Sequence, residues 1–361
     1  MRVLFNISTI TGGGAARVMS CLANQFAEYG DEVGFITAYN EADKGEYPLD
    51  RRVKRFFLSD KKAGTVEKNF AWPRRIGKIC REFNPDAVIS FLPEPNIRML
   101  LGTKRKNFVR VVSVRSDPQR EYRSKLYAFL AKKLYPKADG VVFQTKYAVD
   151  WFEGTLDKNA TVLFNQVDDR FFNIEHSGER RHIMATGRLT APKDHKTLID
   201  AFSRIADKID DDLYIYGEGN LREQLEAQIS SLGLHDRVHL PGSVDNVADV
   251  IKDARVYVLS SIYEGMPNAL LEALAMGLPC ISTDCPCGGP REVIENGLNG
   301  ILIPVGDADA LAEKLMYAYQ NSDEMEQMGR IARERADCFR SDRVFSEWRE
   351  YVENLVKNKR K

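Results

Sequence analysis

Residues 1–29, MRVLFNISTITGGGAARVMSCLANQFAEY, join an apolar run of strand length (3–7) to a helix-length amphipathic segment (15–29) through a glycine-rich turn (11–17). Parallel β-α-β units begin in this way, because the chain crosses over through a helix before the next strand can run in the same direction. In parallel sheets, ligands bind beyond the carboxyl ends of the strands. The opening stretch therefore predicts a parallel α/β domain with a ligand site after its strands.

The same alternation of strand and helix patterns fills two successive parts of the chain, separated by a polar stretch around 165–180 that predicts a linker. The predicted strands are 3–7, 33–37, 87–92, 109–114, 140–144 and 161–164 in the first part, and 183–186, 213–216, 238–240, 256–259, 280–283 and 301–304 in the second. Helices are expected at 125–134, 308–320, 323–338 and 341–356, and a frayed tail at 357–361. Two doubly wound domains facing a cleft follow from this pattern.

Composition allows two domains of ordinary size. The chain has 361 residues, 43% of them hydrophobic, which is enough for two cores. Its 52 Lys and Arg residues balance 52 Asp and Glu residues, so no whole-molecule field points to nucleic acid. The charge is nevertheless uneven, because residues 51–146 hold 24 basic and 8 acidic side chains. That stretch is expected to face an anionic partner.

The six cysteines predict neither a zinc site nor a disulfide framework, since they form no C-x-x-C pair. The close pair Cys285 and Cys287 leaves a metal or redox role open beside a plain loop after a strand. No run of about eighteen apolar residues occurs, which argues against a membrane-spanning helix, and the N-terminal stretch resembles a first strand rather than a signal peptide. A reducing cytoplasm is expected, and attachment to a membrane surface stays open.

Two glycine-containing turns after strands are the first candidate ligand sites. The glycine run 12–14 can bring backbone N–H groups against a phosphate or sugar at a helix N-terminus; the alternative is a tight turn. Gly187 and Arg188 follow the first strand of the second domain, with Lys193 five residues beyond Arg188. These two cations can neutralise a diphosphate leaving group; the alternative is solvated surface charge.

Two glutamates bracket the predicted start of a helix. Glu264 and Glu272 are separated by seven residues, and Pro267 between them suits the first turn of a helix. A loop carboxylate and a second carboxylate inside the helix can accept hydrogen bonds from hydroxyls at two ends of an extended ligand, while helix N–H groups between them hold an anion. Apolar neighbours weaken the alternative that Glu272 is a solvated helix residue.

Taken together, these motifs resemble the retaining glycosyltransferases of family 4. The resemblance rests on the two glutamates, on Gly187, Arg188 and Lys193, on Gly217-Glu218-Gly219 after an intervening strand, and on the N-terminal glycine run. It covers nearly the whole chain and is strongest over residues 181–306. It is closest to bacterial enzymes of capsule, O-antigen and exopolysaccharide assembly and of lipid-linked oligosaccharide extension, including those that add N-acetylgalactosamine to undecaprenyl-diphosphate-linked sugars.

The resemblance implies a GT-B fold with a C-terminal helix that crosses back to the first domain. The acceptor-binding domain would comprise residues 1–172 and the helix 341–361, and the nucleotide-sugar-binding domain residues 178–340. The catalytic residues would be Arg188, Lys193 and Glu264, and the donor-binding residues Gly13, Gly14, Gly187, Gly217, Met266, Asn268, Ala269, Leu270 and Glu272. Glu264 would contact the donor sugar and Glu272 the ribose. No metal is expected, because the two cations and the helix N-terminus would carry the diphosphate.

One position departs from the family pattern. Many relatives carry a histidine after the fifth strand of the first domain, whereas residues 112–117 here read Val-Ser-Val-Arg-Ser-Asp and all five histidines follow residue 170. We expect Arg115 and Asp117 near the sugar or the acceptor, and the alternative is that they stabilise a loop.

The basic first half indicates an acceptor at an anionic membrane surface. Cations at 51–55, 61–62, 74–75, 104–106 and 120–137 are interspersed with the aromatic residues Phe70, Trp72, Phe108, Tyr122, Tyr127 and Phe129. The segment 125–134 could lie in a membrane interface with its lysines toward the headgroups, or it could pack its apolar face on the first sheet. No nucleic-acid motif accompanies the basic patches.

The sequence therefore predicts a cytoplasmic glycosyltransferase, peripheral at the inner face of the cell membrane, that acts with retention. It would move a hexose or N-acetylhexosamine from a UDP-linked donor to a lipid-linked or polysaccharide acceptor. Two alternatives stay open: a nucleotide-sugar epimerase or hydrolase of the same fold, and a non-catalytic component that binds a sugar nucleotide or a polysaccharide. A dinucleotide oxidoreductase is disfavoured, because the glycine run 12–14 lacks the G-x-G-x-x-G fingerprint.

Overall fold

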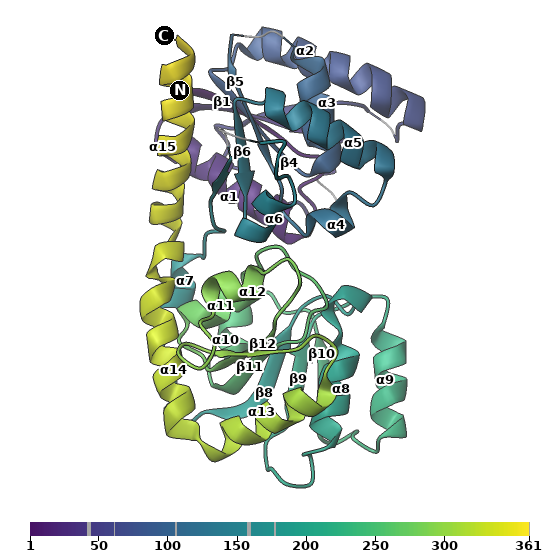
Figure 1. Cartoon of the computed structure of the whole chain (residues 1–361), viewed down its shortest axis with the longest axis vertical. Coiled ribbons are helices and arrows are strands. Elements are labelled where there is room, and N and C mark those ends of the chain that lie inside the picture. Colours follow the sequence, from purple (N-terminus) through teal and green to yellow (C-terminus); the bar gives the residue numbers. More distant parts are fainter. Residues whose placement is uncertain (42–44, 61, 105–106, 157–159, 177, 361) are drawn as a thin grey trace. The chain divides into compact units, whose positions relative to one another are not determined.

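The computed structural model describes residues 1–41, 45–60, 62–104, 107–156, 160–176 and 178–360. The chain forms two compact units, the first made of Met1–Asn165 and Asp342–Lys361 and the second of Gln166–Ser341. Each unit is a parallel sheet with helices on its faces (Figure 1). Lys61, Arg105, Lys106 and Lys361, which belong to the predicted basic stretches and tail, lie outside the described residues.

The sheet of the first unit has parallel strands in the order β3-β2-β1-β4-β5-β6-β7. These strands are β1 (Arg2–Asn6), β2 (Glu32–Thr37), β3 (Lys54–Phe57), β4 (Ala87–Phe91), β5 (Val109–Ser113), β6 (Gly140–Phe143) and β7 (Ala160–Val162). The strand order reverses between β1 and β4. The crevice outside their carboxyl ends is therefore the topological switch point of this unit, where ligands bind in open α/β sheets.

Helices cover both faces of this sheet (Figure 1). One face carries α2 (Trp72–Phe83), α3 (Pro93–Gly102) and α5 (Lys125–Leu134), and the other carries α1 (Gly14–Glu28) and α15 (Ser341–Arg360). The shorter helical segments are η2 (Glu67–Ala71), α4 (Pro118–Glu121), η3 (Tyr135–Lys137) and α6 (Lys146–Asp150). Val344, Trp348, Val352 and Val356 of α15 are buried in one cluster with α1 and the strands. The C-terminal helix thus returns to the first unit, as the resemblance implied.

The prediction of a frayed tail is wrong for residues 357–360, which continue α15. Lys359 Nζ donates to the carbonyl oxygen of Phe108 at 2.8 Å and pairs with Asp139 Oδ1 at 2.7 Å. Arg360 pairs with Asp86 at 2.5 Å. These contacts tie the last turn to the first unit, which a short basic run does not reveal by itself.

The second unit repeats the design with the strand order β10-β9-β8-β11-β12-β13, again all parallel. Its strands are β8 (Arg181–Thr186), β9 (Leu213–Tyr216), β10 (Val238–Gly242), β11 (Ala254–Leu259), β12 (Cys280–Thr283) and β13 (Ile301–Ile303). Its helical elements are α7 (Asp169–Phe172), η4 (Ala191–Lys193), α8 (His195–Ser203), α9 (Arg222–Ser231), α10 (Val247–Ile251), α11 (Asn268–Ala275), α12 (Gly289–Val293), α13 (Ala308–Gln320), α14 (Ser322–Arg335) and η5 (Ala336–Phe339). The switch point lies between β8 and β11.

Two features differ from the sequence expectation. Residues 166–172, assigned above to the first domain, lie in the second unit: Phe171 and Phe172 are buried there, and the Val167 amide donates to the Phe339 carbonyl at 2.8 Å. β3 was not predicted, because this edge strand reads Lys-Arg-Phe-Phe and none of its residues is fully buried. An apolar run, the signal used for the other strands, is absent from it. Among the described residues, no helix is both long and apolar enough to cross a membrane.

Candidate active site

Two turns at the carboxyl ends of β8 and β9 touch each other through their backbones. A Cβ atom on Gly217 would lie 1.9 Å from the carbonyl oxygen of Gly187, and one on Gly219 would lie 2.2 Å from that of Leu189. The Leu189 amide donates to the Glu218 carbonyl at 2.9 Å, which joins the same two turns. Only glycine permits this approach, so the turn that carries Arg188 is held in a fixed place beside its neighbour.

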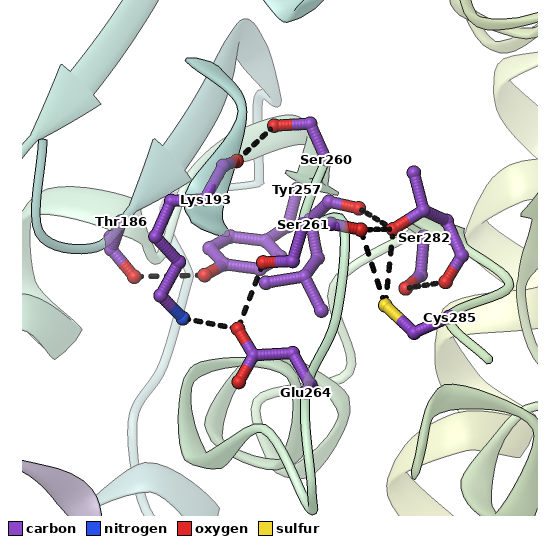
Figure 2. A network of polar contacts seen from close by, with 10 residues as sticks. Thr186, Lys193, Tyr257, Ser260, Ser261, Glu264, Ser282 and Cys285 are labelled. Carbon is purple, nitrogen blue, oxygen red and sulfur yellow. Dashed lines mark hydrogen bonds and ion pairs between the residues drawn. The ribbon is translucent and has the colours of Figure 1, made fainter. Parts of the chain in front are cut away.

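Lys193 and Glu264 meet at the switch point of the second unit (Figure 2). The Lys193 Nζ atom lies 2.5 Å from Glu264 Oε1, and Ser261 Oγ donates to the same oxygen at 2.8 Å. The Ser260 hydroxyl donates to the Lys193 carbonyl oxygen at 2.9 Å. The two charged side chains are only 19% and 17% exposed, so their attraction is screened less than in bulk water. Arg188 is exposed on the adjoining turn.

Buried contacts fix the Ser261 turn from behind. Thr283 Oγ1 donates to the Ser261 carbonyl at 2.6 Å, and Cys285 Sγ contacts the same oxygen at 3.2 Å (Figure 2). Burial raises the pKa of the Cys285 thiol to about 12, so the thiolate that binds metals or reacts with disulfides is not formed at neutral pH. Within the described part of the chain, no group of three or more His, Cys, Asp or Glu residues is placed to hold a metal ion.

The start of α11 lies directly after this turn. The helix begins at Asn268 with Pro267 as its N-cap, one residue later than the sequence suggested. A Cβ on Gly289 would lie 1.6 Å from the Gly265 carbonyl oxygen, so α12 packs tightly on the loop that leads into α11. The first amides of a helix have no acceptor within it and can hold an anion.

The predicted donor-binding residues of α11 divide into two groups. Met266 and Leu270 are buried, whereas Asn268 and Ala269 are partly exposed. Glu272 is 6% exposed and lies in the second turn. Burial of a carboxylate is costly unless polar groups surround it.

His195 and Asp194 were missed by the sequence reasoning. His195 opens α8 and is 4% exposed, with its ring against the backbone of Gly187 and Arg188. Burial and the nearby Lys193 charge lower the pKa of His195 to about 4, so it is neutral at physiological pH. Asp194 caps α8 by accepting from the Thr197 amide at 3.4 Å, and its other oxygen accepts from Thr197 Oγ1 at 2.7 Å. An Asp three residues before a Thr at a helix start was the available signal for the cap.

The remaining predicted site residues belong to the first unit. Gly13 is the N-cap of α1, with φ 84°, and Gly14 is the first residue of that helix. Arg115 is buried, donates to Asn165 and has its guanidinium 4.5 Å from the centre of the Phe91 ring. Burial lowers the pKa of Arg115 to about 9.

Asp117 is also buried, and it caps α4 by accepting from the Gln119 amide at 2.9 Å. These contacts of Arg115 and Asp117 hold the turn after β5 together.

Of the predicted catalytic and donor-binding residues, the structure brings Gly187, Lys193 and Glu264 together within the second unit.

Two family models match successive parts of the chain. "Glycosyltransferase Family 4" matches residues 12–171 and "Glycosyl transferases group 1" matches residues 166–335. The two matches meet at the boundary between the compact units.

Named relatives extend over the whole chain. A Campylobacter jejuni α-1,4-N-acetyl-D-galactosaminyltransferase, named for an undecaprenyl-diphosphate-linked substrate, is 27% identical over 371 residues and covers 99% of each chain. An uncharacterised glycosyltransferase of Methanocaldococcus jannaschii is also 27% identical, covering 90% of this chain and 93% of its own. The Anabaena protein HepE, solved with UDP, superposes with a TM-score of 0.84 at 17% identity over 98% of this chain and 100% of its own. The chain belongs to the family 4 glycosyltransferases of GT-B fold.

Proposed function

We propose that the chain is a retaining glycosyltransferase that moves a hexose or N-acetylhexosamine from a UDP-sugar to a lipid-linked or polysaccharide acceptor in cell-surface glycan assembly. The observation that carries this proposal is the Lys193–Glu264 pair at the switch point, beside Arg188 and the start of α11. Lys193 and Arg188 would neutralise the diphosphate as it leaves, with help from the helix amides. We propose that no metal is needed, because these groups supply the positive charge.

Retention without an enzymatic nucleophile fits the geometry of Glu264. Its Oε1 already accepts from Ser261 and pairs with Lys193, which leaves this carboxylate better suited to orient sugar hydroxyls than to attack carbon. We therefore propose front-face transfer, in which the departing diphosphate helps to take the acceptor proton. The two Campylobacter relatives are named as N-acetylgalactosaminyltransferases acting on undecaprenyl-diphosphate-linked substrates, which supports an acceptor of that kind here.

A thermal-shift titration with UDP, GDP, ADP and NAD tests the donor assignment. UDP alone is expected to raise the unfolding temperature, because a ligand that binds only the folded state stabilises it by about 2.7 kcal/mol at 100 times its Kd. Glu272→Ala should lose this UDP shift, even if its own unfolding temperature is lower. The matched control is Glu226→Ala on α9, whose side chain is 53% exposed. Equal shifts with all four nucleotides, or a shift with NAD alone, would contradict the proposal.

We also propose that the first unit binds an anionic bilayer, which would bring it to a lipid-linked acceptor. The surface is narrower than the sequence suggested, since Trp72, Phe108 and Tyr122 are buried. On or next to η2 and α5, the exposed apolar residues are Val66, Phe70, Leu126 and Phe129, and the lysines are Lys68, Lys125, Lys132 and Lys133. Exposed apolar side chains flanked by lysines match the headgroup boundary of an anionic membrane in both polarity and charge.

Cosedimentation with phosphatidylglycerol-containing vesicles measures this contact. The double variant Leu126→Ser/Phe129→Ser is expected to bind about thirtyfold more weakly, since the half-exposed side chains would each contribute about 1 kcal/mol on insertion. Wild-type binding should also fall at high salt and vanish on pure phosphatidylcholine. Leu232→Ser, at a position 40% exposed in the second unit, is the control. Unchanged binding of the double variant would refute the assignment of α5 as the contact.

A further inference from the structure

One backbone amide in the turn that carries Arg188 differs from its neighbours. The amides of the other three residues of 187–190 are used within the fold: that of Gly187 donates to the Tyr216 carbonyl at 2.9 Å, that of Leu189 to the Glu218 carbonyl at 2.9 Å and that of Thr190 to the Arg188 carbonyl at 2.8 Å. The Arg188 amide donates to no group in the described part of the chain. Its N–H is therefore available to a ligand, as is its exposed side chain.

The peptide group between Gly187 and Arg188 has a defined orientation. In a trans peptide the carbonyl and the N–H that follows it point in opposite directions. A Cβ atom on Gly217 would lie 1.9 Å from the Gly187 oxygen but 3.6 Å from the Arg188 nitrogen. The carbonyl therefore faces the turn after β9, and the Arg188 amide is directed away from that turn.

His195 is a buried ionisable residue that lies against the same peptide group. It is the first residue of α8, and neither of its ring nitrogens has a hydrogen-bond partner among the described residues. Burial and the Lys193 charge lower the pKa of His195 to about 4, while the backbone of Arg188 and Gly187 acts in the opposite direction, as carbonyl acceptors do. The neutral ring has one N–H to donate. The Gly187 carbonyl accepts from no described backbone amide, so it is the open acceptor beside this ring.

The backbone at the start of α8 is fixed, whereas the ring can turn. Asp194 has φ 46° and ψ 44°, a left-handed conformation that is uncommon outside glycine, and its side chain caps the helix through Thr197. The torsion between Cβ and the ring of a histidine is soft. A rotation of the His195 ring can therefore complete a hydrogen bond to the Gly187 carbonyl without moving the backbone. A buried donor that lacks this bond carries a desolvation cost, which favours the paired arrangement.

We propose that His195 is a positioning residue of the donor site: its ring N–H holds the Gly187 carbonyl, so that the Arg188 amide on the opposite side of this peptide group donates to an oxygen of the donor diphosphate. Lys193 runs along the same peptide, since a Cβ on Gly187 would lie 3.4 Å from Lys193 Cδ and Cε. Arg188 would thus offer both its backbone and its side chain to the anion. The identity of the ligand as a donor diphosphate rests on the proposed function, whereas the orientation of the peptide group does not.

Amide NMR of the full chain, deuterated and labelled with ¹⁵N, observes the Arg188 N–H directly. Addition of UDP is expected to move its proton signal downfield, because a hydrogen bond to a charged oxygen is short and strong. Uridine, which lacks the diphosphate, should leave the signal in place. The ring N–H of His195, identified by its loss in His195→Gln, should become protected from exchange with water when UDP is bound.

Variants of His195 separate a positioning role from a structural one. His195→Leu should bind UDP about tenfold more weakly and uridine within about twofold of wild type. Without ligand it should unfold at no lower temperature than wild type, because an apolar side chain of similar volume replaces a ring that has no partner. His195→Gln keeps an N–H donor and should stay within about threefold of wild type for UDP. The matched control is His235→Leu, the same change at an exposed histidine of this unit.

The outcomes distinguish this inference from the proposed function. An Arg188 signal that ignores UDP, or a His195→Leu chain that binds UDP as well as wild type does, would overturn the role of His195 while the wild-type UDP thermal shift keeps the donor assignment. Equal weakening of UDP and uridine by His195→Leu would assign the ring to the fold alone. Absence of any UDP shift in the wild-type chain would remove the proposed donor and this inference together.

Discussion

Replacing Lys193 with Ala is expected to lower the single-turnover rate constant of sugar transfer about a thousandfold. Loss of one preorganised group that stabilises charge in a transition state typically costs a factor of 10² to 10³. Here the same change also removes the partner of Glu264, which lies 2.5 Å from Lys193 Nζ and is only 17% exposed. An unpaired, partly buried carboxylate beside a diphosphate would add repulsion. The upper part of the range is therefore expected.

The measurement is single-turnover transfer from a UDP-sugar, with UDP release and sugar release followed separately. Lys196→Ala is the matched control, because Lys196 is exposed on the following helix only three residues away. It should remain within about twofold of wild type. A Lys193→Ala enzyme within tenfold of wild type would remove Lys193 from the catalytic set. Release of free sugar at an undiminished rate without any acceptor would instead favour the hydrolase or epimerase alternative for the wild-type chain.

The architecture could be predicted from the sequence because the strands of the two sheets are apolar on both faces. Leu213–Tyr216 and Cys280–Thr283 coincide with the predicted strands, and Lys125–Leu134 and Ala308–Gln320 with the predicted helices. Such runs occur where a sheet is covered on both sides. The same rule failed at β3, an edge strand with charged residues. It also failed to show that Lys359 and Arg360 of α15 would pair with groups elsewhere in the first unit.

For the candidate site, the sequence predicted residue types but not their contacts. It placed Lys193 and Glu264 after two different strands, and the parallel topology brings such positions to one edge. It did not predict Ser260 and Ser261, which tie these residues together, although both follow β11 directly.

Packing also changes how the predicted glycines are understood. Gly217 was expected to touch the donor, and the structure gives it a further reason to be glycine. It has φ 150°, and a Cβ atom would lie 1.9 Å from the Gly187 carbonyl oxygen. The sequence shows that position 217 is a glycine. The backbone that contacts it follows another strand, so this contact can be seen only in the folded structure.

Gly217→Ala is accordingly expected to lower the free energy of unfolding by about 2–6 kcal/mol and to abolish the UDP thermal shift. The backbone conformation alone costs about 1–3 kcal/mol, and relieving the overlap forces a shift of packed backbone that typically costs another 1–3 kcal/mol. That shift must move Gly187 or Gly217, and with it the turn that carries Arg188.

Urea unfolding followed by circular dichroism measures this loss, and Gly233→Ala is the matched control. Gly233 lies in the same unit with φ 68°, and nothing within 4 Å would meet its Cβ. Its replacement carries only the conformational cost, about 1 kcal/mol, and should leave the UDP shift intact. If the two variants lost the same stability, the contact between the turns would have no energetic weight. If Gly217→Ala kept its UDP shift, the position of the turn that carries Arg188 would not depend on the contact between the two turns. The donor site would then tolerate a displacement of that turn, which the close packing of these backbones argues against.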